Sequence, residues 1–127
     1  MDVSNCLLLY EVWCNDNESL TQLNVSGCIS MESINCYNNQ ITSLDVSDLK
    51  NLRGLICAQN QIQALNLSGL SNLKSVNLND NRLTTLNVSG LKNLISIACD
   101  NNALYSLNVS QCSTLEQISC EIIKLHH

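Results

Sequence analysis

The sequence repeats itself every 21 residues, and this period limits the fold more than any other feature. LDVSDLKNL at 44–52 returns as LNLSGLSNL at 65–73 and as LNVSGLKNL at 86–94. A fixed period of roughly 20 to 50 residues is typical of solenoids, in which each unit buries its apolar side only against its neighbours. The chain of 127 residues is therefore predicted to form a single stack of short coils, with about five and a half repeats over residues 1–125.

The apolar positions of the repeat form columns along the chain. One unit reads L-x-x-I-x-C-x-x-N-x-I-x-x-L-D-V-S-x-L-x-x. Around Ile34 and Cys36 apolar and polar residues alternate, which predicts a short half-buried strand. Strands of successive units are expected to pair as a parallel sheet, about 4.8 Å apart. So short a repeat leaves room for tight turns and brief extended pieces, such as 44–46, but for little or no α-helix.

The columns resemble the leucine-rich repeat, whose signature is L-x-x-L-x-L-x-x-N/C-x-L. The variant with Cys in the third apolar position and Leu-Asp/Asn-Val-Ser on the return is similar to repeats of cysteine-ladder internalin-like proteins of bacteria. This resemblance implies a right-handed coil with the sheet on a concave face and short turns, 3-10 or extended segments on the convex side. It also implies an extracellular or cell-surface module that binds a protein partner, or a glycan, without catalysis.

Two polar columns are predicted to serve the turns. The first follows the strand, points inward and bonds backbone groups of its own and adjacent coils; it comprises Asn17, Asn39, Asn60, Asn81 and Asn102, with Ile123 in the sixth unit. The second consists of Asn-x-Ser triplets that match the N-glycosylation pattern, but Asp45 takes the same place before Val46-Ser47. Because Asp cannot accept a glycan, this position is predicted to form a turn.

Eight cysteines invite a disulfide interpretation, but their positions favour reduced core thiols. They fall in two columns, one with Cys14, Cys36, Cys57, Leu78, Cys99 and Cys120, and one with Cys6, Cys28, Leu49, Leu70, Leu91 and Cys112. A bridge between stacked neighbours is the alternative, with Cys14 and Cys36 as the favoured pair because they lie near an end. The sequence has no C-x-x-C pair, so we expect neither zinc nor another cofactor.

Composition and charge argue against several functions. A net charge of −5 with only six basic residues gives no basic patch for a nucleic acid. The apolar run at 6–10 is too short to span a bilayer, and no basic segment precedes it, so neither membrane insertion nor a signal peptide is expected. The only histidines are His126 and His127, interpreted as a tag remnant, so no nucleophile has a histidine base. A non-catalytic protein is predicted.

The outward positions of the expected strands vary while the frame repeats, so they are the candidate contact surface. Exposed aromatic side chains contribute a large share of binding energy at interfaces. Trp13, Tyr37 and Ile56 are expected to lie diagonally on three adjacent strands of the concave face, with an acidic flank that ends at Glu121. The predicted partner-binding residues are Trp13, Tyr37, Ile56, Asn35, Asn77, Asp80 and Asp100. Alternatively, Trp13 and Tyr10 only cover the end of the stack.

The two ends of the sequence break the repeat. The chain starts in mid-repeat with Met1-Asp2-Val3-Ser4, and the pattern stops just after Leu125. We therefore expect an excised piece of a longer array, whose unpaired strand edges favour end-to-end self-association. A structural spacer, or an engineered repeat scaffold without a ligand of its own, is the alternative function.

Overall fold

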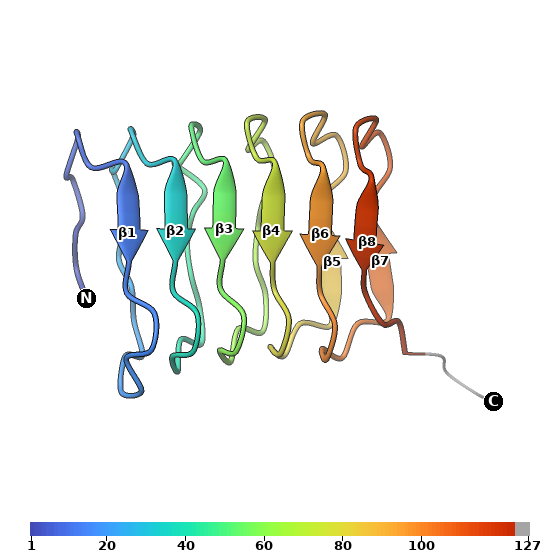
Figure 1. Ribbon diagram of the computed structural model, residues 1–127, viewed down its shortest axis with the longest axis horizontal. Helices are drawn as coiled ribbons and strands as arrows, with labels where there is room; N and C mark the ends of the chain where they lie inside the picture. Colours follow the sequence, from blue (N-terminus) through green and yellow to red (C-terminus); the bar gives the residue numbers. More distant parts are fainter. Residues whose placement is uncertain (124–127) are drawn as a thin grey trace.

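The computed structural model describes residues 1–123 as a β-solenoid of about five turns (Figure 1). Its strands are β1 (Glu11–Trp13), β2 (Ser33–Asn35), β3 (Gly54–Ile56), β4 (Ser75–Asn77), β5 (Thr85–Asn87), β6 (Ser96–Ala98), β7 (Ser106–Asn108) and β8 (Gln117–Ser119). Residues 1–123 contain no helix, and so none that could cross a membrane. Residues 124–127, which include Leu125 at the end of the predicted domain and the expected tag remnant at 126–127, lie outside the described part.

Six strands form one parallel sheet, the main sheet, in the order β1-β2-β3-β4-β6-β8. Figure 1 shows them side by side across the front of the molecule. Equivalent positions of successive units pair directly, so that Ile34 lies opposite Leu55 and Val76 opposite Ile97. The predicted parallel sheet, with one strand from each coil, is confirmed.

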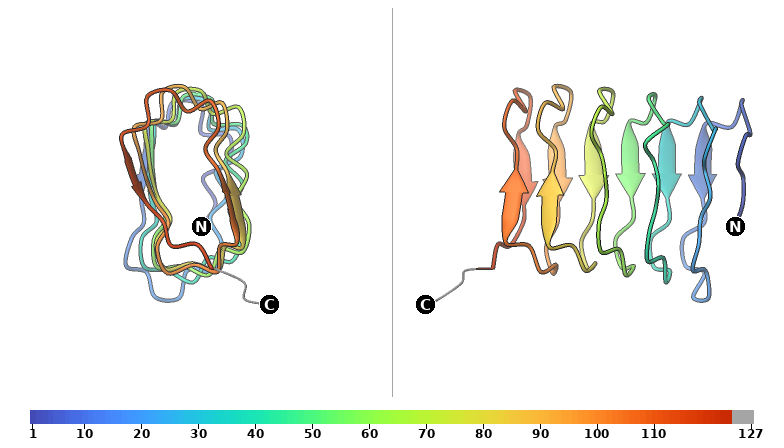
Figure 2. Two further views of the ribbon diagram at one scale, coloured as in Figure 1. Left: turned by 90° about the vertical axis from the view of Figure 1, so that its right-hand side faces the viewer. Right: turned by 180° about the vertical axis from the view of Figure 1, so that it is seen from behind.

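The return segments lie on the opposite side of the coil, as the end-on view in Figure 2 shows. Extended pieces were predicted for these segments, and in the last two coils they form paired strands. There β5 and β7 pair as a second parallel sheet, in which Leu86 lies opposite Leu107. The coil is therefore flattened between two extended walls.

The core fills the space between these walls with one layer of apolar side chains for each coil. Ile34 and Leu55 of the main sheet are completely buried, as are Ile41 and Ile62 of the return segments. The last coil has no described neighbour on its outer side, so Ile118 is 51% exposed. Burial of a coil thus depends on the coil that follows it, as expected for a solenoid.

The inward asparagine column is confirmed as a hydrogen-bond ladder between coils from Asn39 to Asn102, whereas Asn17 in the first coil is exposed and its amide donates only within its own coil. Asn39, Asn60 and Asn81 are buried, and each donates to the backbone oxygen of a residue in its own coil and of one in the preceding coil. The sixth unit differs, as its Ile123 predicted. The Ile123 N–H donates to Leu104 O at 2.7 Å, whereas Ala103, the residue after Asn102, fills this role towards Leu83. The last coil therefore reaches this position one residue early.

The cysteines correct the prediction in three ways. Cys99 and Cys120 form a disulfide, with 4.6 Å between their Cα atoms, so the prediction of reduced thiols is wrong for this pair. The favoured alternative pair, Cys14 and Cys36, is free. Cys6 is exposed rather than part of the core.

The remaining members of the strand column behave as predicted. Cys14, Cys36 and Cys57 are free and buried. Leu78 is completely buried in the same column and separates Cys57 from Cys99. The column is thus divided into a reduced part and a bridged part.

Candidate functional site

The outward face of the main sheet carries the predicted contact residues. The pairing of β1 to β4 sets Trp13, Asn35, Ile56 and Asn77 in one row across four adjacent strands. Trp13 is 72% exposed and Ile56 is 40% exposed, whereas Asn35 between them is half-buried. Two large apolar side chains therefore stand out from the face on either side of an asparagine.

Asn35 serves the backbone beside this pair. Its Oδ1 accepts the N–H of Tyr37 at 3.1 Å and so fixes the turn that follows β2. Asn77 does the same for Asn79 after β4, also at 3.1 Å. Such a turn leaves the NH2 group of each amide for other contacts. Tyr37, two residues beyond the strand position, is half-buried rather than fully exposed.

The two predicted acidic residues lie in different columns. Asp80 is exposed and sits in the turn after β4 with a φ of +59°, a conformation that Asp tolerates better than most residues. Asp100 is half-buried, and its carboxylate accepts a hydrogen bond from the Ser119 hydroxyl on the neighbouring coil. Their backbones are bonded, since Asp80 N–H donates to Asp100 O at 2.9 Å. The Asp100 carboxylate therefore already accepts a hydrogen bond within the protein, which leaves fewer of its acceptor positions for a partner.

A shallow depression of about 650 Å³ lies on the same face beside Ile56. Small outward residues form its surface on β4, β6 and β8, among them Ser75, Ser96 and Ala98. Glu116, in the turn before β8, lies at its edge. The face thus has projecting apolar side chains over β1 to β3 and a hollow over β4 to β8.

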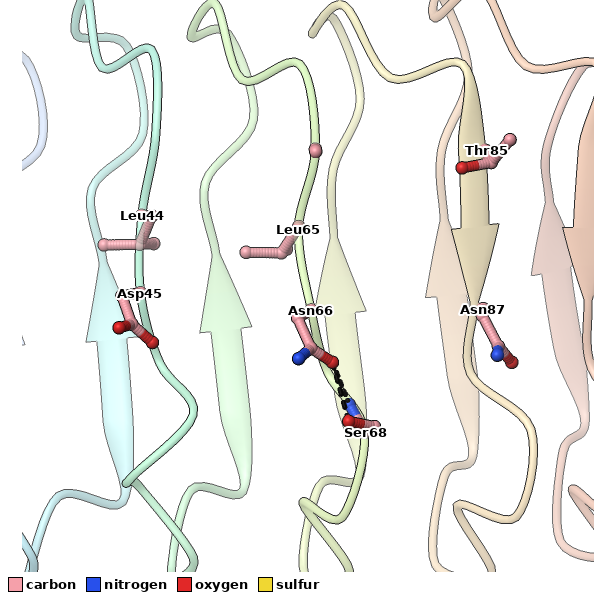
Figure 3. A pocket seen from close by; sticks show the side chains of 8 residues that line it. Leu44, Asp45, Leu65, Asn66, Ser68, Thr85 and Asn87 are labelled. Carbon is pink, nitrogen blue, oxygen red and sulfur yellow. Dashed lines mark hydrogen bonds between the residues drawn. The ribbon is translucent and has the colours of Figure 1, made fainter.

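The return face carries the Asx-x-Ser column, shown in Figure 3. The Asn66 side-chain oxygen accepts from the Ser68 N–H at 3.0 Å and from the Ser68 hydroxyl at 2.7 Å. Asp45 makes the same pair of bonds to Ser47, and these donors lower the pKa of the Asp45 carboxyl. The predicted turn-forming role of this column is confirmed. A second depression of about 430 Å³ lies among these residues.

Sequence reasoning missed one polar ladder and misplaced one residue. In the turns that precede the main strands, Asn51, Asn72 and Asn93 each donate to a backbone oxygen of the preceding coil at 2.8 to 3.0 Å. Their spacing of 21 residues was the available signal. Ala58 holds the repeat position of Tyr37 in the next coil, where alternation along the strand places an outward side chain, but it is only 3% exposed.

The free thiols offer little reactivity in the core. A hydrogen bond with Cys36 and complete burial raise the pKa of the Cys57 thiol well above its usual value, and burial raises the pKa of Cys14. The thiolate is the nucleophilic form, so both side chains are held in the unreactive form. In the part of the chain that the structure describes, no three histidine, cysteine, aspartate or glutamate residues are grouped to hold a metal ion.

Fold and columns together define a leucine-rich-repeat β-solenoid with a ladder of cysteines and a ladder of asparagines. Among solved structures, the chain is similar to the functional domain of InlJ from Listeria monocytogenes, which is described as including a cysteine ladder. The two have 28% sequence identity and a TM-score of 0.69, over 99% of this chain and 34% of that one. The chain thus spans about a third of that structure.

A second structure supports the fold alone. It is an internalin, InlF, also from Listeria monocytogenes, with 19% sequence identity and a TM-score of 0.52 over 85% of this chain and 47% of that one. No protein-family model matches the sequence, and no curated protein sequence is similar to it. The internalin-like resemblance drawn from the sequence therefore has its support in structure neighbours.

Proposed function

We propose that the chain is a non-catalytic recognition module that binds a protein partner through the outward face of the main sheet. The observation that carries this proposal is the exposure of Trp13 and Ile56 in one row of that face, at 72% and 40%. Large side chains that project from a rigid sheet lose little conformational freedom on binding, and tryptophan is enriched among residues that dominate interface energies. Tyr37 adds a half-buried aromatic edge beside them.

The internalin-like neighbours support the same class of function. They favour a repeat domain of an extracellular or cell-surface protein, and we propose this location for the protein to which the chain belongs. Asn35, Asn77, Asp80 and Asp100 are proposed as polar contacts at the margin of the apolar pair. A glycan would instead need the NH2 groups of Asn35 and Asn77 and the hydroxyls of the neighbouring depression.

The test is a comparison of partner capture by matched variants. The wild-type chain, Trp13→Ala, Ile56→Ser and Tyr105→Ala are immobilised, partners are identified by mass spectrometry, and affinities are then measured with the purified partner. Tyr105 is the control because it is 59% exposed and lies directly before β7 on the return side. Loss of a central contact of this size typically weakens binding by about 2 kcal/mol, or about thirtyfold.

The outcomes separate the alternatives. The proposal expects Trp13→Ala and Ile56→Ser to weaken binding while Tyr105→Ala does not. Full-strength binding by both sheet variants would assign recognition to another face. A wild-type chain that captures neither protein nor glycan would favour the structural spacer or the scaffold without a ligand.

A further inference from the structure

Basic residues gather at one edge of the main sheet, in the turns that precede three of its strands. Lys50 and Arg53 lie in the turn before β3, Lys74 directly precedes β4, and Lys92 lies in the turn before β6. Figure 1 shows these turns next to one another at the upper ends of the three strands. Each of the three coils has a neighbouring coil on both sides. The four residues are called the basic rim below.

The repeat brings these charges together although the sequence separates them. Arg53 and Lys74 are one repeat length apart, and Lys50 and Lys92 are two repeat lengths apart. Because neighbouring strands are about 4.8 Å apart, the first pair lies on adjacent coils and the second is separated by about 9.6 Å. Four of the six basic residues of a chain with a net charge of −5 therefore share one small surface.

Hydrogen bonds hold the backbone of the basic rim in place. Arg53 O accepts the N–H of Lys74 at 2.8 Å. Lys50 O and Lys92 O each accept a side chain of the following coil, at 2.9 Å and 2.7 Å. The hydrogen bonds that the structure describes for these four residues are all made by their backbones, and all four residues are exposed. Their charged groups are therefore available to a partner.

The side chain of Lys50 extends towards the turn of the next coil. A Cβ atom added to Gly69 would lie 3.4 Å from Lys50 Nζ, so the ammonium group lies beside this glycine. Gly69 has a φ of +76° and holds the repeat position that Asp48 holds one coil earlier. The lack of a side chain at Gly69 leaves room for the ammonium group over the coil that carries Lys74. The positive charges are thus closer together than the repeat spacing alone would place them.

Carboxylates limit the basic rim in both directions along the stack. The column that holds Arg53 and Lys74 has Glu32 on one side and Glu116 on the other. Between them, Asp48 is the only acidic residue in the turns before β3, β4 and β6. Like charges repel, so a long polyanion that followed the stack would be opposed at Glu32 and at Glu116. A short acidic segment would meet only the basic stretch.

We infer that the basic rim docks a short acidic segment of the protein partner, laid across the turns before β3, β4 and β6. Alternate side chains of an extended peptide lie on one side at intervals of about 6.6 Å, which long lysine and arginine side chains on rows about 4.8 Å and 9.6 Å apart can reach. The Arg53 guanidinium can bind a carboxylate through two parallel hydrogen bonds. The inference rests on the proposed function only in that the partner is a protein, because the rim shares no residue with the proposed contact residues.

The test measures binding of a labelled peptide to the purified chain by fluorescence anisotropy. The peptide is short and has glutamates at alternate positions, with glycines between them, and a second peptide has glutamines in their place. Only the glutamate peptide should bind. Its binding should weaken as salt rises from about 0.01 M to about 0.15 M, because the Debye length falls from about 30 Å to about 8 Å. Heparin is tested in parallel as a long polyanion.

Matched variants test whether the rim itself is the binding surface. Arg53→Gln and Lys74→Gln should each weaken peptide binding about two- to fivefold, which is the contribution of one exposed ion pair. Arg82→Gln is the control and should leave binding unchanged. It removes the same charge from an exposed arginine, but in the turn after β4, at the opposite edge of the main sheet. Circular dichroism checks that each variant is folded.

The readout is separate from that of the proposed function. The peptide has no apolar side chain, so its binding reports on the rim, whereas partner capture by Trp13→Ala and Ile56→Ser reports on the outward face. Either result can fail without the other. Weakening by Arg53→Gln and Lys74→Gln but not by Arg82→Gln, together with the salt dependence, would support the inference.

Three results would overturn the inference. The first is no binding of the glutamate peptide at low salt. The second is equal weakening by Arg53→Gln and Arg82→Gln, because binding would then follow the net charge of the chain rather than the rim. The third is tighter binding of heparin than of the peptide, which would assign the rim to a sulfated polysaccharide instead of a protein segment.

Discussion

The side-chain amide of Asn60 donates a hydrogen bond to the backbone oxygen of Cys36, one coil earlier, at 2.9 Å. The same NH2 group donates to Cys57 O in its own coil at 3.2 Å, and the Asn60 oxygen accepts the N–H of Ile41 at 3.0 Å. One buried side chain thus bonds backbone groups of two coils. Asn39 and Asn81 also donate to the two carbonyl oxygens, whereas Asn60 is the described partner of the Ile41 N–H.

Replacement of Asn60 by Ala should therefore be among the most destabilising polar substitutions in the chain. It leaves the buried Ile41 N–H without this partner, at about 1–3 kcal/mol, and removes one of the two amide donors to each of the Cys36 and Cys57 oxygens, so we expect a loss of about 3 kcal/mol in the free energy of unfolding. Urea unfolding followed by circular dichroism measures it. Asn66→Ala is the control, because Asn66 makes only exposed bonds to Ser68 and should cost under about 1 kcal/mol. Equal losses in the two variants would contradict the ladder.

Asp45 should contribute an acid-dependent part of the stability. Hydrogen bonds from the Ser47 hydroxyl and backbone N–H lower the folded pKa of the Asp45 carboxyl below its usual value. A lowered folded pKa means stabilisation that is present above the unfolded pKa and is lost as pH falls through the folded value. Asp45→Asn keeps the turn, as Asn66 shows, but removes this titration. Its stability should match wild type at pH 7 and fall less steeply below about pH 4, as measured by thermal unfolding at each pH; parallel profiles would contradict the assignment.

Gly27 should tolerate a side chain less well than the other turn glycines. Gly27 and Gly90 share a φ near +75°, at +75° and +77°, which disfavours Ala by about 1–2 kcal/mol at either position. At Gly27 the added Cβ would also overlap Oδ1 of Asn5, whereas at Gly90 the nearest atom is 4.0 Å away. Gly27→Ala should therefore unfold at lower urea concentration than Gly90→Ala. Gly54→Ala, without a positive φ, should stay within about 0.5 kcal/mol of wild type.

Thiol counting tests the cysteine arrangement. Of eight cysteines, six are free, so an alkylating reagent should add six groups to the unfolded, unreduced chain and eight after reduction. In the folded chain the exposed Cys6 should react first, and Cys57 only on unfolding, because burial and the Cys36 hydrogen bond raise the pKa of its thiol. Intact-mass spectrometry at successive times measures both the number of added groups and the rate at which the folded chain gains them. Eight additions without reduction would contradict the bridge between Cys99 and Cys120.

The repeat frame could be predicted from the sequence because residues at the same repeat position have the same kind of neighbours in every coil. Ile34, Leu55 and Val76 recur at 21-residue intervals, and this interval alone sets the register of the main sheet. The buried role of Asn60 followed in the same way, since an asparagine that recurs in five units among apolar columns is explained by backbone groups of a turn that need partners.

Features that break this equality could not be predicted in the same way. Cys14 with Cys36 and Cys99 with Cys120 are identical pairs in the repeat, and only their positions in the stack distinguish the free pair from the bridged one. In the candidate site, outward placement of Trp13 was predictable from alternation. The engagement of the Asn35 oxygen by the backbone of Tyr37 was not, because it depends on the path of the chain after β2.

The buried Leu78 has a consequence for how oxidation would spread. Disulfide exchange passes between sulfur atoms that can touch, and from Cys57 to Cys99 the chain rises by two strand spacings, about 9.6 Å, beyond the roughly 7 Å that a disulfide can span. Leu78 therefore keeps Cys57 and Cys99 too far apart for disulfide exchange. Exchange with the disulfide between Cys99 and Cys120 therefore does not pass along the column. The thiols of Cys14, Cys36 and Cys57 are oxidised or reduced independently of it.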